Sequence, residues 1–241
     1  RGDPFALVLR ALIHHSGGKP GLLSTTVEGP PGGGIGGSSA LLIALLELTA
    51  RVAGRPLRRD RLAELARDLE ASILGLPTGV QDYYPAIHGG ALQLRYGPGP
   101  AKVARLECDL AELESRLLLA YSGKAHSSAP SNWGLYRRRL EGDPVAVEAF
   151  GRIGEAAGRA AKALESGDWR ALGSAMNADW AARKRLDPEL CPPDLATLED
   201  AAAEVGVAGA KGCGAASGGC MIFLLRSAAH RERLGAALGS V

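Results

Sequence analysis

The stretch "EGPPGGGIGGSSALLIALL", residues 28–46, places a glycine-rich loop directly before an apolar run of helical length. Glycine loses more backbone entropy on folding than any other residue, so a dense run of glycines indicates a backbone that must approach something closely. The first amides of a helix lack partners within the helix, and the helix dipole is positive there. The stretch therefore predicts an anion site, typically for phosphate, with Ser38 and Ser39 in the first helical turn. A plain capped helix after a flexible turn is the alternative.

Two familiar phosphate-binding signatures are absent from the sequence. There is no G-x-x-x-x-G-K-[ST], which excludes a P-loop. The run "GGGIGG" fits G-x-G-x-x-G only loosely. No acidic residue ends a second strand about 20 residues later, where a dinucleotide-binding fold would need one, and "RPLRRD" stands there instead. The sequence therefore does not favour a dinucleotide-binding fold.

Composition narrows the class of protein. The 241 residues are 46% hydrophobic and 22% charged, with a net charge of +2, which is ordinary for a globular chain and does not suggest a nucleic-acid partner. The four cysteines show neither CxxC pairing nor metal-ligand spacing, so we expect reduced thiols. The most apolar window, "SSALLIALLELTARVAG", is short and is interrupted by Glu47 and Arg51. We expect a cytoplasmic protein without a membrane partner.

Helical and strand patterns alternate along the chain, which predicts the α+β class. The expected helices cover about 4–15, 37–53, 58–74, 144–165, 168–185, 194–204 and 227–238. The expected strands lie within 21–30 ("GLLSTTVEGP"), 91–97, 101–109, 115–123 and 221–226 ("MIFLLR"), with 91–97 and 101–109 paired. Two loops stand out: the compact "GLPTGVQDYYPAIHGG" (75–90) and the glycine-rich "GAKGCGAASGGC" (209–220).

Three stretches in this order resemble the GHMP kinases, the family of galactose, homoserine, mevalonate and phosphomevalonate kinases. Residues 31–40 resemble the family's nucleotide loop, with Ile35 in place of a leucine and Gly37 in place of the first serine. Residues 70–90 resemble the loop of the acidic pair, and 209–225 resemble the C-terminal glycine motif, with Ala216 and Ser217 where glycines are usual. The glutamine before Asp82 and the aromatic after it resemble the sugar-kinase branch, above all the heptose 7-phosphate kinases.

This resemblance covers essentially the whole chain and implies a two-lobed α+β fold. It implies a ribosomal S5 domain 2-like N-terminal lobe over residues 1–110 and a ferredoxin-like C-terminal lobe over 111–241. The family's first motif, on strands ahead of everything seen here, has no match in the sequence, which starts at Arg1 without an initiator methionine. We therefore expect either that about 70–90 residues of the N-terminal lobe precede Arg1 or that the protein is a truncated form of the family fold.

The resemblance also implies roles for individual residues. ATP would be bound by the two glycine-rich loops, through Gly32, Gly33, Gly34, Ile35, Gly36, Gly37, Ser38 and Ser39 in the first, and Lys211, Gly214, Ala215 and Ala216 in the second. Mg²⁺ would be held by Ser38 and by Glu70, which stands 12 residues before Asp82. Asp82 would face the acceptor hydroxyl, as a general base or as an orienting group.

Each of these residues also has a structural interpretation. Glu70 could be a solvated helix residue, Asp82 a turn residue and Lys211 a surface lysine. Tyr83 and Tyr84 could stack on a sugar or pack in the core.

The implied activity is ATP-dependent phosphorylation of a sugar or sugar phosphate, most simply a heptose 7-phosphate. One alternative is a family kinase for another small alcohol, such as a hexose, a uronic acid or mevalonate. Another is a non-catalytic nucleotide- or sugar-binding relative. The oligomeric state is not readable from the sequence, and a homodimer is compatible with it.

Overall fold

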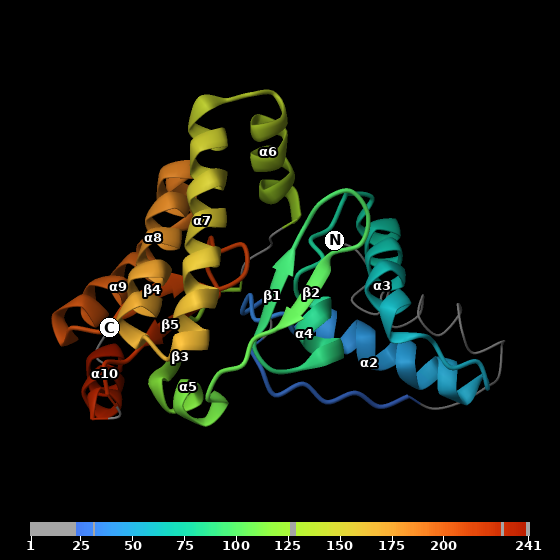
Figure 1. Ribbon diagram of the computed structural model, residues 1–241, viewed down its shortest axis with the longest axis horizontal. Helices are drawn as coiled ribbons and strands as arrows, with labels where there is room; N and C mark the ends of the chain where they lie inside the picture. Colours follow the sequence, from blue (N-terminus) through green and yellow to red (C-terminus); the bar gives the residue numbers. More distant parts are fainter. Residues whose placement is uncertain (1–22, 31, 126–128, 228, 240–241) are drawn as a thin grey trace. The chain divides into compact units, whose positions relative to one another are not determined.

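The computed structural model describes residues 23–30, 32–125, 129–227 and 229–239, which form two compact units (Figure 1). The first unit contains Gly36–Arg105 and the segment that ends at Gly29. The second unit contains Leu106–Val241 and the short segment Pro30–Ile35. The glycine-rich loop at residues 32–39 is therefore shared, and it passes from the second unit to the first between Ile35 and Gly36. The lobe boundary at 110/111 stays a prediction, because units defined by contacts need not coincide with lobes.

In its described residues the first unit packs three helices around an apolar core and adds a two-stranded sheet. Its elements are α2 (Gly37–Val52), α3 (Arg59–Leu74), α4 (Tyr83–His88), β1 (Leu92–Arg95) and β2 (Lys102–Arg105). The apolar residues of α2 recur at helical spacing, and Leu42, Leu46 and Ala50 are fully buried. They pack with side chains of α3 and α4 such as Leu62 and Tyr83. The helices expected over 37–53 and 58–74 are thereby confirmed.

Strands β1 and β2 form an antiparallel pair with Leu92 opposite Arg105, as the sequence predicted. The strand expected within 21–30 is wrong for residues 23–30, which form neither strand nor helix. In the described part of the chain β1 and β2 pair only with each other, so this segment has no ladder to join. Its β-branched residues Thr25, Thr26 and Val27 are exposed, and β propensity acts mainly through packing on a sheet. The helix expected over 4–15 lies outside the described residues.

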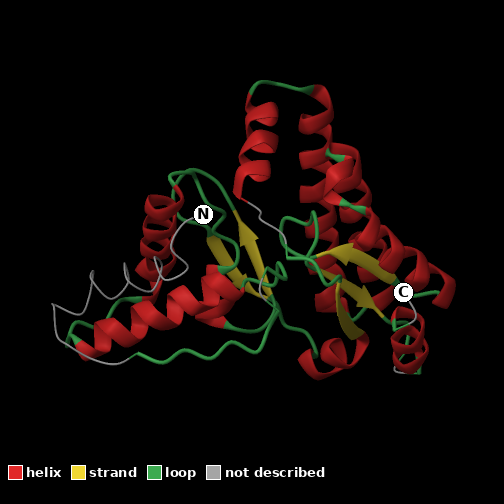
Figure 2. Ribbon diagram, turned by 180° about the vertical axis from the view of Figure 1, so that it is seen from behind, coloured by secondary structure: helices red, strands yellow, loops and turns green. Residues whose placement is uncertain are grey.

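The second unit sets helices against a three-stranded antiparallel sheet, drawn in yellow in Figure 2. Its elements are α5 (Leu110–Arg116), β3 (Leu117–Tyr121), α6 (Ala129–Leu140), α7 (Pro144–Ser166), α8 (Trp169–Leu186), a 3₁₀ turn (Pro188–Leu190), α9 (Pro193–Val205), β4 (Gly209–Gly212), β5 (Cys220–Leu224) and α10 (His230–Leu238). The strand order is β3-β5-β4, with Leu117 and Gly209 both opposite Leu224. Met221, Phe223 and Leu225 lie in the core, which explains the apolar run at 221–226.

Helix α8 lies directly on the edge strand β4. A Cβ atom on Gly209 would come within 2.7 Å of the Cα of Gly173, so the backbones touch where both residues are glycine. The side-chain oxygen of Asn177 accepts a hydrogen bond of 2.9 Å from the amide of Ala210, which satisfies part of the open edge of β4. Strand β4 is thus fixed from its side as well as through β5.

Four elements were not expected from the sequence, namely α4, α5, α6 and β4. Helix α4 has six residues and contains Pro85, so the segment read as a loop. Helix α5 is seven residues long and begins at a cap, where Asp109 accepts the amide of Glu112. Helix α6 contains a proline and a glycine, which obscure its period. Strand β4 begins and ends with glycine, and only its pairing with β5 makes it a strand.

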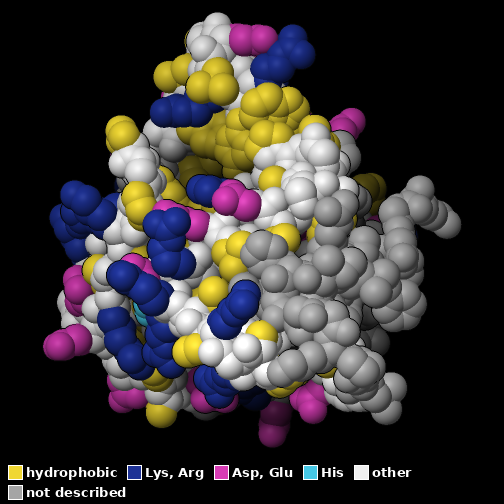
Figure 3. Space-filling model, turned by 90° about the vertical axis from the view of Figure 1, so that its right-hand side faces the viewer, with side chains coloured by type: hydrophobic (Ala, Val, Ile, Leu, Met, Phe, Trp, Pro, Cys, Tyr) yellow, Lys and Arg dark blue, Asp and Glu magenta, His cyan; other side chains and the backbone are white. Residues whose placement is uncertain are grey.

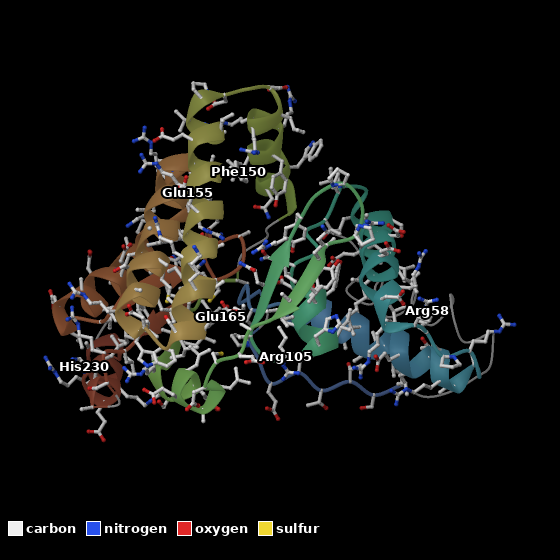
Figure 4. All side chains as sticks on the ribbon, in the orientation of Figure 1. Arg58, Arg105, Phe150, Glu155, Glu165 and His230 are labelled. Carbon is white, nitrogen blue, oxygen red and sulfur yellow. The ribbon has the colours of Figure 1, made fainter. Side chains whose placement is uncertain are left out.

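The corner where α6 meets α7 carries an exposed apolar set. Phe150 points from α7 toward α6 (Figure 4), its ring centre 5.7 Å from that of Tyr136 and beneath the guanidinium of Arg139. Leu140, at the end of α6, is 78% exposed. Apolar side chains gather beneath charged ones near the top of Figure 3, where these helices lie. No helix in the described residues combines the length and apolar character needed to cross a membrane.

Candidate active site

The part of the glycine-rich loop that belongs to the second unit is bonded through its backbone. The amide of Gly33 donates to the carbonyl of Pro30 at 3.1 Å, and the carbonyl of Gly33 accepts the amide of Cys220 at 2.8 Å. A Cβ atom on Gly33 would lie 3.0 Å from the carbonyl oxygen of Pro30 and 3.1 Å from the sulfur of Cys220. A side chain here would be tighter than an ordinary contact, so Pro30 or Cys220 would have to shift to admit one.

The second glycine-rich segment, the β4–β5 loop (residues 213–219), packs against the first. Gly214 has φ +56°, and a Cβ atom on it would lie 2.7 Å from the carbonyl oxygen of Gly34. Gly219 has φ +77° and would clash in the same way with the carbonyl oxygen of Gly33. Two segments at least 180 residues apart in sequence thus meet backbone to backbone. Three of the residues predicted to bind ATP, Gly33, Gly34 and Gly214, are brought together here.

Ala216 and Ser217 keep the conformation that glycine would favour. Their φ angles are 67° and 65°, and in the described residues no other non-glycine residue has positive φ. The left-handed region costs a residue with a side chain roughly 1–2 kcal/mol. The amide of Ala216 donates to Cys213 and that of Ser217 to Leu190, each at 3.0 Å. The departure from glycine noted in the sequence therefore does not change the left-handed backbone. Ala215 lies in the same loop and is partly exposed.

Three charged side chains, two on α8 and one on β4, form a cluster that is hydrogen-bonded to the β4–β5 loop. The carboxylate of Asp179, 7% exposed, accepts from Lys211 Nζ at 2.5 Å and from Arg183 Nε at 3.0 Å. Arg183 also donates through Nη1 to the carbonyl of Gly214 at 2.8 Å. Burial, and next the charge of Arg183, hold the pKa of Lys211 below its usual value. We call these three residues the brace. The phosphate contact predicted for Lys211 stays a prediction.

The part of the glycine-rich loop that belongs to the first unit opens helix α2. Gly36 is the N-cap with φ 77°; no side chain caps the helix, and its first turn carries no acidic residue. The amides of Gly37, Ser38 and Ser39 therefore have no partner of the usual capping kind. Ser38 is exposed and Ser39 is buried. The plain capped helix considered as the alternative would usually show a side-chain cap, which this end lacks, and its free amides suit an anion.

Asp82 lies against this end of α2. A Cβ atom on Gly36 would come within 3.1 Å of the Cβ of Asp82, so the backbone of Gly36 lies close against the side chain of Asp82. Burial raises the pKa of the Asp82 carboxyl, and the charge of Glu70 raises it further, against a hydrogen bond from Gln81. A partly buried carboxyl that feels a second carboxyl and has no ion pair among the described residues is unusual in a structural role.

Glu70, on α3, is held by two hydroxyl groups. Thr78 Oγ1 donates to Glu70 Oε2 at 2.9 Å, and the phenol of Tyr83 donates to the same oxygen. Tyr83 is fully buried in the core of the first unit, so the sugar-stacking role considered for it is wrong. Burial, and then Glu70, raise the pKa of Tyr83, which keeps its phenol protonated. Tyr84 instead stacks on His88, with ring centres 6.5 Å apart.

The oxygen ligands present fit a magnesium ion bound together with a nucleotide. Ser38 and Glu70 supply a hydroxyl and a carboxylate, and Mg²⁺ commonly binds to one or two such groups, completing its shell with phosphates and water. In the described part of the chain no cluster of three or more acidic, histidine or cysteine side chains could hold a metal. The described residues therefore suit a metal ion bound together with a nucleotide better than one bound by protein groups alone.

Sequence reasoning missed Thr78, Asp179 and Arg183. Thr78 stands eight residues after Glu70 and bonds to it only because the 75–82 turn folds back on α3. Asp179 and Arg183 are one helical turn apart, a spacing as common on solvated helices as in buried pairs. No signal in the sequence separates the two cases.

Two family models and several known proteins match this sequence. Residues 5–90 match the model of the GHMP kinases N terminal domain, and residues 160–241 match that of the GHMP kinases C terminal domain. The D-glycero-alpha-D-manno-heptose 7-phosphate kinase of Campylobacter jejuni is 27% identical over 207 residues, 84% of this chain and 60% of that protein. The mevalonate kinase of Pyrococcus horikoshii is 28% identical over 208 residues, 84% of this chain and 58% of that protein.

A solved structure shows the same fold. The D-glycero-D-manno-heptose 1-phosphate kinase of B. thetaiotaomicron superimposes with a TM-score of 0.73 at 22% identity, covering 98% of this chain and 68% of that one. The chain thus spans about three fifths of the length of the curated relatives it matches.

Proposed function

Because this chain belongs to the GHMP kinase family, we propose that it forms most of an ATP-dependent kinase that phosphorylates a hydroxyl of a sugar or sugar phosphate. One observation supports this most directly. The first unit places an uncapped helix N-terminus next to Asp82, and Asp82 within electrostatic reach of Glu70. Phosphoryl transfer needs these parts: donors for phosphate, a carboxylate for a metal and a group that orients the acceptor.

In this proposal the chain's own residues divide the work. The amides at the start of α2 and the two glycine-rich loops bind the phosphates of ATP. Ser38 and Glu70 hold Mg²⁺, which when bound offsets the charge of the phosphates. Asp82 accepts a hydrogen bond from the acceptor hydroxyl and takes its proton as the oxygen bonds to the γ-phosphorus and the bond to the β-phosphate oxygen breaks. A raised carboxyl pKa makes Asp82 a better base than an exposed aspartate.

We propose a heptose phosphate as the acceptor, by analogy with the heptose kinases among the relatives. The heptose 7-phosphate kinase is 27% and the mevalonate kinase 28% identical to the chain, so identity alone does not separate these two acceptors. A hexose, a uronic acid or mevalonate is the alternative acceptor. A non-catalytic relative is less consistent with this chain, because Glu70 and Asp82 are both present and Ala216 and Ser217 retain the left-handed backbone of glycine.

The test is direct product formation by the full-length protein that contains this chain. The protein is incubated with ATP and Mg²⁺ and with heptose 7-phosphate, free heptose, galactose, glucuronic acid or mevalonate, and phosphorylated product is measured by mass spectrometry. We expect product with one acceptor class, and a loss of at least about 100-fold in rate for Glu70→Gln, with metal-free nucleotide binding retained. Binding of ATP without product from any acceptor would leave only the binding-protein alternative.

A further inference from the structure

Two hydroxyl groups converge on one oxygen of Glu70. Thr78 Oγ1, in the turn after α3, and the phenol of Tyr83, at the start of α4, both donate to Oε2. In the described residues Glu70 Oε1 receives no hydrogen bond from the protein, and Glu70 forms no ion pair there. The carboxylate is thus held at one oxygen and left open at the other.

The phenol is an unusually fixed donor. The ring of Tyr83 is fully buried and packs in the core with Leu42, Leu46, Leu62 and Ile87. A buried aromatic ring has little freedom, so its hydroxyl stays where the core places it. A glutamate without such donors would sample several rotamers and would lose that freedom when a ligand fixes it.

From this arrangement we propose that Tyr83 and Thr78 are positioning residues for the metal. They fix Glu70 through Oε2, so that Oε1 is the oxygen offered to Mg²⁺. The inference rests on the proposed function, since that function supplies the metal. Hydrogen bonds to a metal-binding carboxylate typically change metal affinity by about 10–100-fold when they are removed. We expect this chain to lie at the lower end, because each of two donors can partly replace the other.

The test measures metal binding rather than turnover. Mn²⁺ is titrated into the full-length protein saturated with a non-hydrolysable ATP analogue, and free Mn²⁺ is followed by electron paramagnetic resonance. Tyr83→Phe keeps the buried ring and removes only the donor; we expect Mn²⁺ affinity to fall about tenfold, with metal-free affinity for the analogue unchanged. Tyr84→Phe makes the same change one residue later, away from Glu70, and should leave Mn²⁺ affinity unchanged.

Thr78 gives an independent arm that does not disturb the core. Thr78→Val should weaken Mn²⁺ binding by several-fold, and Thr78→Ser, which restores the hydroxyl, should recover it. In a Glu70→Gln background neither Tyr83→Phe nor Thr78→Val should weaken binding further, because the residue they act through is already altered.

The outcomes separate this inference from the function it rests on. If wild-type protein binds Mn²⁺ with the analogue and Tyr83→Phe and Thr78→Val bind it equally well, the positioning role is wrong and the kinase proposal is untouched. If both variants weaken binding but the loss persists in the Glu70→Gln background, the hydroxyls act elsewhere and the inference again fails. If wild type shows neither Mn²⁺ binding nor phosphoryl transfer, both proposals fail together.

Discussion

Each unit contains a buried or partly buried aspartate, and the two aspartates differ in the charges that surround them. In the second unit Asp179 has two cations on one oxygen, Lys211 and Arg183. In the first unit Asp82 has no ion pair in the described residues; its closest charged influence is a second acid, Glu70, and its carboxyl pKa is raised. The first arrangement stabilises a loop, and the second costs stability. A carboxyl kept at such a cost, with a hydrogen bond from Gln81 but no cation in the described residues, is the pattern of a functional residue.

The same contrast divides the glycine-rich loop. Its Gly32–Ile35 part is hydrogen-bonded to Cys220 of β5 and packs closely against the β4–β5 loop, so its conformation is imposed by these neighbours. Its Gly36–Ser39 part is imposed by helix α2, whose first amides face no capping side chain. Rigidity in one part thus comes from packing, and binding capacity in the other comes from amides that the fold leaves unused.

The largest effect should come from breaking the brace. Asp179→Ala leaves Lys211 and Arg183 as mostly buried cations without their partner, which should lower the free energy of unfolding by about 3 kcal/mol. Urea denaturation followed by circular dichroism measures it. A milder change, Arg183→Lys, keeps the charge but loses the bond to the Gly214 carbonyl and should cost about 1 kcal/mol. If Asp179→Ala costs less than 1 kcal/mol, the brace is only a surface ion pair.

Asp82→Asn should reduce activity and not stability, the opposite of the result expected for Asp179→Ala. If Asp82 is the base, kcat should fall by about 100-fold or more, with ATP affinity nearly unchanged. Stability should stay level or rise at neutral pH, since a charged carboxyl that the fold disfavours is gone.

The pH dependence of stability tests the direction of the pKa shift of Asp82. A carboxyl whose pKa is raised on folding binds its proton more tightly in the folded state. Its contribution to stability is therefore full below the ordinary value of 3.8 and is lost as the pH rises through the raised pKa. Unfolding of Asp82→Asn across pH 3 to 7 should lack this decline. A variant that is both active and less stable would make Asp82 a structural residue.

The smallest effects sharpen the contrast within the loop itself. Gly36→Ala forces a side chain into the left-handed region and against Asp82, and should cost about 1–2 kcal/mol and weaken ATP binding. Gly37→Ala, one residue later, meets no atom within 4 Å in a helical position, and should gain up to about 0.5 kcal/mol with ATP binding retained. Thermal unfolding and calorimetric titration compare the two. If both variants lose the same stability and ATP affinity, the position at the start of the helix, and not the contact with Asp82, determines whether a side chain is tolerated.

Much of this arrangement was predictable because its signals are local. The helices over 37–53 and 58–74, the strand at 221–226 and the glycine loop before α2 all follow from spacing within a short window. The prediction that Asp82 and Glu70 belong to one site came from resemblance to a family, and the site roles built on it stay predictions.

The rest depends on contacts between distant residues. Strand β4 consists of residues that favour a loop, and it forms because β5 and Asn177 satisfy its backbone. The segment 23–30 has strand-forming residues but no neighbouring strand. The hydrogen bond from Tyr83 to Glu70 joins two helices, and no sequence pattern near either residue predicts it. Local propensity is overridden at these points by tertiary partners.

The left-handed pair at Ala216 and Ser217 has a consequence for the unfolded chain. With glycine at both positions, the unfolded loop would sample far more backbone conformations than it does with two side chains present, and more entropy would be released on unfolding. The two side chains remove about 0.4–1 kcal/mol of that entropic advantage at each position, which offsets much of the strain they cause in the folded loop. The β4–β5 loop therefore has the shape of a glycine loop, and its chain loses less backbone entropy on taking that shape than two glycines would.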